Sequence, residues 1–392
     1  MVTTRVETIV VGGGAMGAAT AWQLARRGRE VVLLERWEPG HRMGASHGAT
    51  RNFNVAYADP TYVAMLAEAL PLWRELEAES GAELLDLVGV ASHGPSDGFD
   101  DVHAALTAAG IPAEFLSAKQ AAKRWPGIRF DTRVLFNEEA GRVRADASVP
   151  ALHETAAAAG ADVRHRTQAT SIDVVDDGLV RVASVSDAGV AEVFEARTAV
   201  VTVGAWTTKL VGAERLPRLV VTQEQPAHFA VRDEAAAWPS FNHFPGAGDA
   251  YDYWLSPVYG MLTPGEGVKA GWHGVGPVVD PDARDFEAVP EQLAALQRYA
   301  REWLPGVDAE VAAPVSCTYT TTPDEHFVLD RLGPLVVGAG FSGHGFKFTP
   351  VIGRILADLA NGSGPAPELF AADRVIAEHP SSPTGLGGVR AD

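Results

Sequence analysis

The sequence is poor in cysteine and in positive charge, and it lacks long hydrophobic runs. Cys317 is the only cysteine among 392 residues, which excludes a disulfide framework and fits a reducing compartment. The 32 Lys and Arg residues against 50 Asp and Glu residues give a net charge of −18, which opposes binding to nucleic acid or to an anionic membrane surface. No apolar run is long enough to cross a bilayer, and no secretory signal precedes the first expected strand. We therefore expect a cytoplasmic protein with no nucleic-acid or membrane partner, and we predict no metal site.

The N-terminal segment carries the most informative motif of the chain. An apolar strand at residues 9–11 runs into Gly12-Gly13-Gly14-Ala15-Met16-Gly17, and a helical run that ends at Gly28 follows. A second apolar strand, residues 31–34, ends in Glu35. G-x-G-x-x-G between a strand and a helix is typical of a dinucleotide-binding βαβ unit, whereas the bare motif can be no more than a tight βα turn.

Each part of this motif has a physical role in nucleotide binding. Gly12 permits the tight turn, Gly14 lets the backbone approach a pyrophosphate, and Gly17 lets helix and strand pack closely. The N-terminus of the helix supplies unpaired N–H groups and the positive end of the helix dipole. Glu35 stands close to where a ribose-binding carboxylate belongs, and its charge repels a 2′-phosphate. The motif therefore favours FAD or NAD over NADP.

A second glycine-rich unit near the C-terminus favours a large cofactor with two ends. Residues 334–339 read as a strand and residues 340–345 as a turn, after which Thr349 and Pro350 begin a helix that runs to about Ala360. A third strand is expected at residues 199–203. The nucleotide-binding domain is thus predicted to assemble from separate pieces of the chain.

Other segments predict helices and a second sheet. The expected helices begin at Asp59-Pro60, with Pro71 as a kink or break before Glu79; at Ser148 to Pro150, ending at Gly160; and at Pro290, ending at Trp303. Between about residues 215 and 325, β-branched and aromatic runs broken by Gly and Pro predict strands, among them VVTQEQPAHFAV, YDYWLSPVYGML, VKAGWHGVG and VSCTYTTT.

These elements predict a mixed α/β fold, with a Rossmann-like FAD-binding domain and a second, largely antiparallel β-sheet domain for the substrate. We expect the discontinuous FAD-binding domain to comprise residues 1–85, 145–212 and 326–375. Residues 86–144 and 213–325 are assigned to the substrate domain, and residues 376–392, rich in Pro, Gly and Ser, to a tail.

Four segments resemble monomeric sarcosine oxidase and N-methyltryptophan oxidase. They are SHGATR, KAGWHG, CTYTTTPDEHF and GAGFSGHGFKF, in the same order and spacing, and the resemblance extends from the first strand to about residue 360. It implies a monomeric FAD-dependent oxidase that takes a hydride from the carbon beside the nitrogen of a secondary amine or N-methyl amino acid to flavin N5. The imine is then released, and O2 reoxidises the flavin and yields H2O2.

The resemblance gives the single cysteine a role. In the family, a cysteine at the position of Cys317 forms a thioether with the 8α-methyl carbon of the flavin, so covalent FAD is expected here. A thiolate is the nucleophile that such a bond requires. The alternative is a free thiol that serves as a small buried apolar residue.

Further catalytic roles follow from the same resemblance. Lys269 matches a lysine beside the flavin that promotes reaction with oxygen, and His273 matches a histidine near the substrate. On an alternating strand these two side chains share one face. Tyr319 and Tyr253 match active-site tyrosines, and Arg51 matches an arginine at the flavin ring. The alternatives are a surface lysine, a core histidine and a surface arginine.

Substrate and cofactor residues complete the expected site. Lys347 matches the lysine that binds the substrate carboxylate, and Gly343 and His344 match backbone positions beside it. Asn54 replaces a family arginine that pairs with that carboxylate, and Trp254 and Trp272 add bulk, so we expect a substrate larger than sarcosine. The predicted FAD-binding residues are Gly12, Gly14, Ala15, Met16, Gly17, Glu35, Arg36, Ser46, Thr50, Cys317, Gly343, Gly345, Phe346 and Lys347.

Three other functions remain open from the sequence. One is a flavin amine dehydrogenase that passes electrons to an acceptor other than oxygen, which Lys269 argues against. Another is a nucleotide-binding protein without catalysis, which the retained Lys269, His273, Cys317 and Lys347 argue against. A colourless protein would instead indicate an NAD-dependent dehydrogenase.

Overall fold

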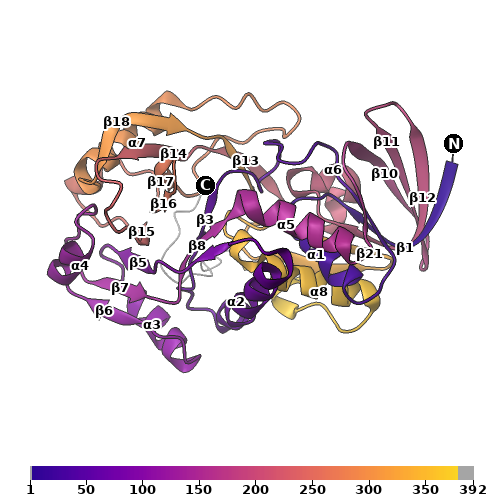
Figure 1. The fold of residues 1–392 in the computed structure, drawn as a ribbon, viewed down its shortest axis with the longest axis horizontal. Helices are drawn as coiled ribbons and strands as arrows, with labels where there is room; N and C mark the ends of the chain where they lie inside the picture. The colour runs from indigo at the N-terminus through magenta and orange to yellow at the C-terminus, as the bar shows by residue number, and fades with distance from the viewer. Residues whose placement is uncertain (1, 378–392) are drawn as a thin grey trace.

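A computed structural model describes residues 2–377, and two eight-stranded sheets dominate it. The predicted tail, residues 376–392, lies outside the described residues from position 378 onward. The sheets occupy opposite sides of the view in Figure 1, with helices α1, α2, α5 and α8 grouped beneath and beside the first sheet. The predicted mixed α/β fold class is confirmed.

The first sheet has a parallel centre and antiparallel margins. Its strand order is β10-β11-β12-β1-β2-β9, with β21 beside β12 and β20 beside β21. The parallel strands are β1 (Val2–Val11), β2 (Val31–Leu34), β9 (Asp162–Arg164), β12 (Ala191–Val201) and β21 (Leu335–Ala339). The antiparallel strands are β10 (Thr167–Asp176), β11 (Leu179–Ser186) and β20 (Val328–Leu332).

Four helices pack into the main hydrophobic core beside this sheet. Helix α1 (Ala15–Ala25) contacts α5 (Ala145–Ala158) and α8 (Thr349–Asn361), and α2 (Pro60–Ser80) contacts both α5 and α8. Trp22 and Trp73 are fully buried among them. Strands and helices from both ends of the chain thus share one core, so the two glycine-rich units can face the same space.

The second sheet has the order β18-β14-β17-β16-β15-β5-β7-β6 and is antiparallel except between β15 and β5. Its strands are β5 (Val90–His93), β6 (Glu114–Leu116), β7 (Val134–Asn137), β14 (Ala227–Val231), β15 (Ser240–His243), β16 (Val258–Thr263), β17 (Gly267–Trp272) and β18 (Val307–Pro314). Helix α7 (Pro290–Trp303) packs against β18, β14 and β17. The assignment of these sheets to two domains with the expected boundaries stays a prediction.

Smaller elements link the two sheets. Strand β13 pairs with β19, and β3 pairs with β8, which also pairs with β4. Their bounds, and those of the remaining helices, are β3 (Thr50–Phe53), β4 (Leu85–Asp86), β8 (Gly141–Arg144), β13 (Val220–Glu224), β19 (Cys317–Thr321), α3 (Phe99–Ala108), α4 (Ala118–Arg124) and α6 (Thr207–Val211). None of the helices within residues 2–377 combines the length and apolar character needed to traverse a lipid bilayer.

Several expected boundaries differ from the structure. Helix α5 begins at Ala145 rather than near Ser148, and Pro150 stands inside it, because the buried Ala145 anchors an earlier turn in the core. The stretch YDYW forms no strand, since residues Asp249–Tyr251 make a 3-10 turn. The predicted helix from Pro290 to Trp303 is confirmed, and α2 continues through Pro71 without a break.

Candidate active site

One cleft of about 540 Å³ connects the two glycine-rich units. At one end it is lined by the loop between β1 and α1, and at the other by β19 and the loop that leads to α8. Gly12 and Met16 line the first end, and Cys317 and Phe346 line the second. Residues separated by most of the chain therefore face a single elongated space.

The loop after β1 has the geometry of a phosphate cradle. Gly12 has φ +98°, and a Cβ atom there would lie 2.7 Å from the carbonyl oxygen of Thr202. A Cβ atom at Gly17 would lie 1.8 Å from the carbonyl oxygen of Gly12, so only glycine fits. Helix α1 begins at Ala15 beside the cleft with no acidic side chain in its first turn. The positive end of its dipole is therefore not neutralised locally, which suits a pyrophosphate.

Glu35 marks the same end of the cleft. Its carboxylate is buried, and Oε2 accepts a hydrogen bond of 2.8 Å from the backbone N–H of Gly13. Oε1 accepts a 3.0 Å bond from the N–H of Trp37. These bonds fix the side chain at the end of β2, with its carboxylate on the cleft, where a carboxylate can accept bonds from ribose hydroxyls.

Other predicted cofactor residues lie along the cleft or just behind it. Ser46 Oγ accepts a 3.0 Å bond from the N–H of Ala15, and Arg36 lies 2.9 Å from the carboxylate of Asp282. Thr50 is buried, and its hydroxyl lies 2.6 Å from that of Thr263. The side chain of Thr50 therefore faces away from the cleft.

A buried lysine and an arginine lie near the Cys317 end. Lys269 on β17 is buried, and its Nζ donates to the carbonyl oxygen of Thr50. Burial, followed by the positive charge of Arg51, lowers the pKa of Lys269 to about 7. Arg51 donates 2.9 Å bonds to the carbonyl oxygens of Ala45 and Thr50 and lines the cleft. This end of the cleft therefore concentrates positive charge around Cys317.

A second buried lysine forms a compact cluster with Tyr57 and His344. Lys347 Nζ donates to the Tyr57 hydroxyl at 2.9 Å and to the His344 carbonyl oxygen at 2.7 Å. The Tyr57 hydroxyl lies 3.0 Å from His344 Nδ1. Burial lowers the pKa of Lys347 to about 7. Because its head group is desolvated, Lys347 can change its charge near neutral pH.

His273 and Tyr319 belong to the same region. Their ring centroids are 5.3 Å apart, and burial, followed by the charge of Lys347, lowers the pKa of His273 to about 4. His273 does not share the strand of Lys269 as expected, because β17 ends at Trp272 and Gly274 turns the chain with φ +71°. A Cβ atom at Gly343 would lie 2.2 Å from the ring of Tyr319, so glycine is required there.

The structure does not bring every predicted residue to this cluster. Tyr253 donates its hydroxyl hydrogen to Glu302 on α7 at 2.9 Å, and the guanidinium of Arg298 lies over its ring. Asn54 Oδ1 accepts a 2.9 Å bond from the N–H of Ala56, so this oxygen is turned back onto its own backbone. The indole of Trp272 donates to the carbonyl oxygen of Gln292, inside the core of the second sheet rather than toward the cleft.

Two tyrosines missed in the sequence take part instead. Tyr57 contacts Lys347, as described above. Tyr259 on β16 pairs in register with Gly271, and a Cβ atom at Gly271 would lie 2.9 Å from the Tyr259 hydroxyl. Burial, followed by the negative charge that Cys317 carries as a thiolate, raises the pKa of Tyr259, so this ring lies near the Cys317 end of the cleft. The sequence did contain a signal for Tyr259: Gly271, in KAGWHG, has no side chain and so leaves room for an aromatic ring on the neighbouring strand.

Comparison with known proteins decides the family. Residues 7–359 match the FAD dependent oxidoreductase family. The chain belongs to that family. It is 34% identical to the monomeric sarcosine oxidase of Bacillus sp. (strain NS-129) over 373 residues, which cover 91% of this chain and 93% of the relative. It is 28% identical to the N-methyl-L-tryptophan oxidase of Yersinia pestis (strain Pestoides F) over 362 residues, which cover 90% of this chain and 94% of the relative.

A solved structure agrees with this membership of the FAD dependent oxidoreductase family. The open form of NikD, an amino acid oxidase essential for nikkomycin biosynthesis, superposes with a TM-score of 0.82 at 27% identity. The superposition covers 96% of this chain and 99% of NikD. The predicted resemblance and the prediction of an FAD-dependent enzyme are confirmed, while the covalent bond and the individual roles of the site residues stay predictions.

Proposed function

We propose that this protein oxidises a secondary amine or N-methyl amino acid with FAD held along the cleft, and that O2 is the final electron acceptor. The observation that carries the proposal is the grouping of Lys347, Tyr57 and His344 in one hydrogen-bonded cluster, with a second buried lysine, Lys269, near the Cys317 end of the cleft. FAD, when bound, supplies the hydride acceptor and the route for electrons to oxygen.

Each group of residues has its own part in this reaction. The loop at Gly12 and the N-terminus of α1 would hold the pyrophosphate, and Glu35 would hold the ribose. Lys347, Tyr319 and His273 would orient the amine. The uncharged state of His273 at neutral pH suits contact with a neutral amine, from which hydride can leave to give an imine. The imine would then hydrolyse to a carbonyl product.

The substrate is proposed to be larger than sarcosine or to bind without the usual carboxylate anchor. This rests on Asn54, because an asparagine provides no charged donor fork for a carboxylate. The bulk of Trp272 does not support the proposal, since its side chain packs in the core of the second sheet. A monomeric state, in line with the name of the monomeric sarcosine oxidase, and a cytoplasmic location complete the proposal.

Anaerobic bleaching of the yellow protein tests this function. We expect bleaching within seconds by some members of a panel of N-methyl amino acids, cyclic imino acids and simple secondary amines, with sarcosine among the slow ones. Admission of oxygen should restore the colour with one H2O2 for each amine oxidised. Bleaching without peroxide, but with turnover on an artificial acceptor, would indicate a dehydrogenase. A colourless protein, or one that no amine bleaches, would contradict the proposal.

Covalent attachment of FAD through Cys317 is a separate expectation. Cys317 is half-buried and faces the cleft, with Sγ 3.9 Å from the carbonyl oxygen of Ala45. A C–S bond to the 8α-methyl carbon would replace an S–H and a C–H bond, which would release two protons and leave two electrons on FAD for O2 to take up. Flavin fluorescence should stay with the acid-denatured polypeptide on a gel, and Cys317→Ser should release all of it. Flavin that washes out of the unaltered protein would disprove the bond.

A further inference from the structure

The hydrogen bonds around Lys347 have a fixed direction. His344 Nε2 lies 3.0 Å from the carbonyl oxygen of Glu325, which can only accept, so Nε2 carries the hydrogen. Burial, followed by the charge of Lys347, holds the pKa of His344 well below its usual value, so the ring is uncharged at neutral pH. An uncharged imidazole with its hydrogen on Nε2 has an acceptor at Nδ1.

This tautomer decides the direction of the next two bonds. The Tyr57 hydroxyl donates its only hydrogen to His344 Nδ1 at 3.0 Å. Its oxygen therefore accepts from Lys347 Nζ at 2.9 Å. A second N–H of Lys347 donates to the carbonyl oxygen of His344 at 2.7 Å. Both neighbours only accept from Nζ, so one tetrahedral position remains: a third N–H in the charged form and a lone pair in the uncharged form.

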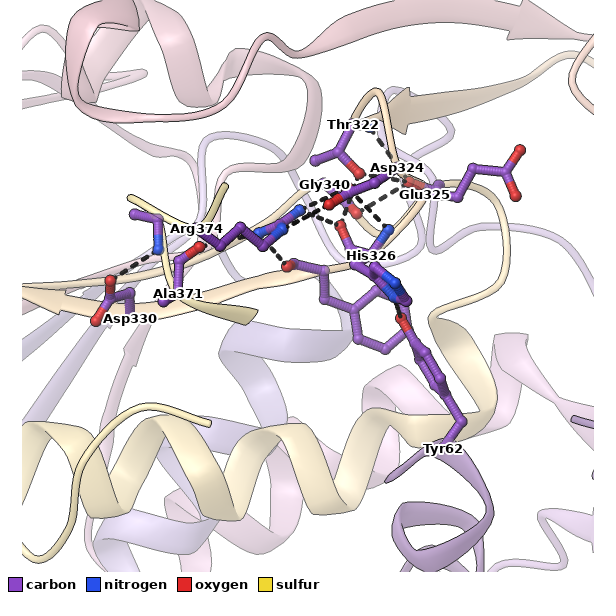
Figure 2. A network of polar contacts seen from close by, with 12 residues as sticks. Tyr62, Thr322, Asp324, Glu325, His326, Asp330, Gly340, Ala371 and Arg374 are labelled. Atoms are coloured by element: carbon purple, nitrogen blue, oxygen red, sulfur yellow. Dashed lines mark hydrogen bonds and ion pairs between the residues drawn. The ribbon is translucent and has the colours of Figure 1, made fainter. Parts of the chain in front are cut away.

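The first acceptor in this series, the carbonyl oxygen of Glu325, lies next to a buried ion pair between Asp324 and Arg374, which Figure 2 shows. Glu325 has φ +58°, a left-handed conformation that is uncommon for residues other than glycine. Arg374 Nε and Nη2 each lie 2.7 Å from a carboxylate oxygen of Asp324, and the N–H of Glu325 donates to the carbonyl oxygen of Thr322 at 3.1 Å. The Glu325 carbonyl belongs to the peptide between Glu325 and His326. The N–H of His326 donates to Asp324 Oδ1 at 3.2 Å, so the ion pair also holds the peptide that points at His344.

We propose that Lys347 is the base that removes the proton from the ammonium group of the substrate. The inference rests on the proposed function and deepens it. The N–H bond of the substrate breaks, its electron pair stays on the substrate nitrogen, and the proton binds the lone pair of Nζ. No net charge enters or leaves the complex. The new ammonium of Lys347 then provides the positive charge for a substrate carboxylate that Asn54 does not.

The groups that face Lys347 do not titrate in its range. Tyr57 contributes from the loop before α2, and burial, followed by the charge of Glu325, raises its pKa. His344 lies in the loop before α8, and His273 follows β17 with a pKa of about 4. Lys347 itself has a pKa of about 7 because it is buried. A protonation step near pH 7 in amine oxidation therefore identifies either Lys347 or the other buried lysine, Lys269.

The test is the pH dependence of anaerobic flavin reduction in the holoenzyme, with pairs of amines that differ only in the carboxylate, such as N-methyl-L-tryptophan and N-methyltryptamine. For the amine without a carboxylate, kred/Kd should rise with pH through about 7, where Lys347 loses its proton, and then level off. In Lys347→Met this levelling off near pH 7 should be lost, and kred/Kd should continue to rise up to the pKa of the free amine. An alkylammonium with a pKa near 10 is about 1% deprotonated at pH 8, so the variant should be roughly 100-fold slower there, with the deficit shrinking tenfold for each pH unit above.

Two further variants separate the possibilities. Lys269→Met should retain the rise near pH 7. Tyr57→Phe should move the rise to lower pH, because the ammonium form of Lys347 loses an acceptor, and this variant keeps the test valid if Lys347→Met does not fold. Two results for Lys347→Met would contradict the proposal: an unchanged pH profile, or a loss of rate with only the carboxylate-bearing amine. Either would show that Lys347 binds the substrate carboxylate and does not accept the proton. Failure of every amine to bleach the flavin would instead refute the proposed function, and this inference with it.

Discussion

Replacing Lys269 with methionine is expected to slow the reoxidation of reduced flavin by O2 by roughly 10²-fold or more, as does the loss of a preorganised electrostatic group. The side chain is buried on β17 and held by the carbonyl oxygen of Thr50. An ammonium in such a desolvated place stabilises developing superoxide far more than it would in water. Because the charged form acts, reoxidation should slow as pH rises through the pKa of Lys269, about 7.

Stopped-flow measurement of the two half-reactions checks this expectation. Reduction by the amine under anaerobic conditions should change by much less than reoxidation by oxygen. Lys209→Met is a suitable control, because Lys209 lines the cleft but is paired with Asp280 and Asp282 at the surface. Equal slowing of both half-reactions in Lys269→Met would assign the residue to amine binding instead.

Arg374→Met is expected to lower the free energy of unfolding by about 3–5 kcal/mol, because it leaves the carboxylate of Asp324 buried without its partner. Both side chains are more than nine-tenths buried, and the guanidinium also donates to the carbonyl oxygens of Phe327 and Ala371. The double variant Arg374→Met with Asp324→Asn should recover part of the loss, since it removes both charges.

Urea unfolding of the holoprotein measures this effect, and pH gives a second reading. Burial alone would raise the pKa of Asp324, but the hydrogen bonds and charge of Arg374 hold it below its usual value. The contribution of this ion pair to the free energy of unfolding is therefore fully present above the pKa that Asp324 has in the unfolded chain. It is lost as pH falls through the lower pKa that Asp324 has in the folded protein. Arg301→Met, which breaks an exposed pair with Glu310, should cost under about 1 kcal/mol. A similarly small cost for Arg374→Met would disprove the stabilising role of the ion pair between Asp324 and Arg374.

The parts of the site that sequence predicts well are those whose chemistry is local. The turn from Gly12 to Gly17 requires glycines because atoms a few residues away, and Thr202 just beyond the neighbouring strand, would collide with a Cβ atom. Glu35 follows its strand directly, so its place at the cleft was predictable from position alone. Helix α7 begins at a proline and carries its apolar face at helical spacing, which fixed its bounds.

The parts that the sequence concealed depend on pairing over long distances. Tyr253 and Tyr259 lie in one aromatic stretch, and which of them joins the site depends on where β16 begins, which its register with β17 decides. Tyr57 joins Lys347 only because the loop before α2 meets the loop before α8. Pro150 suggested the start of a helix, yet burial of the preceding turn outweighed the local preference of proline.

During protein synthesis, Asp324 is made before its partner Arg374. The two residues are 50 positions apart, and the ribosome releases the carboxylate first. The ribosome therefore releases the loop of Asp324 and Glu325, which contacts His344, before it releases the guanidinium of Arg374 that neutralises the buried Asp324. A frameshift or a stop codon after the end of α8 at Asn361 but before position 374 would consequently disturb the surroundings of His344 and Lys347, although it alters none of the residues that line the cleft.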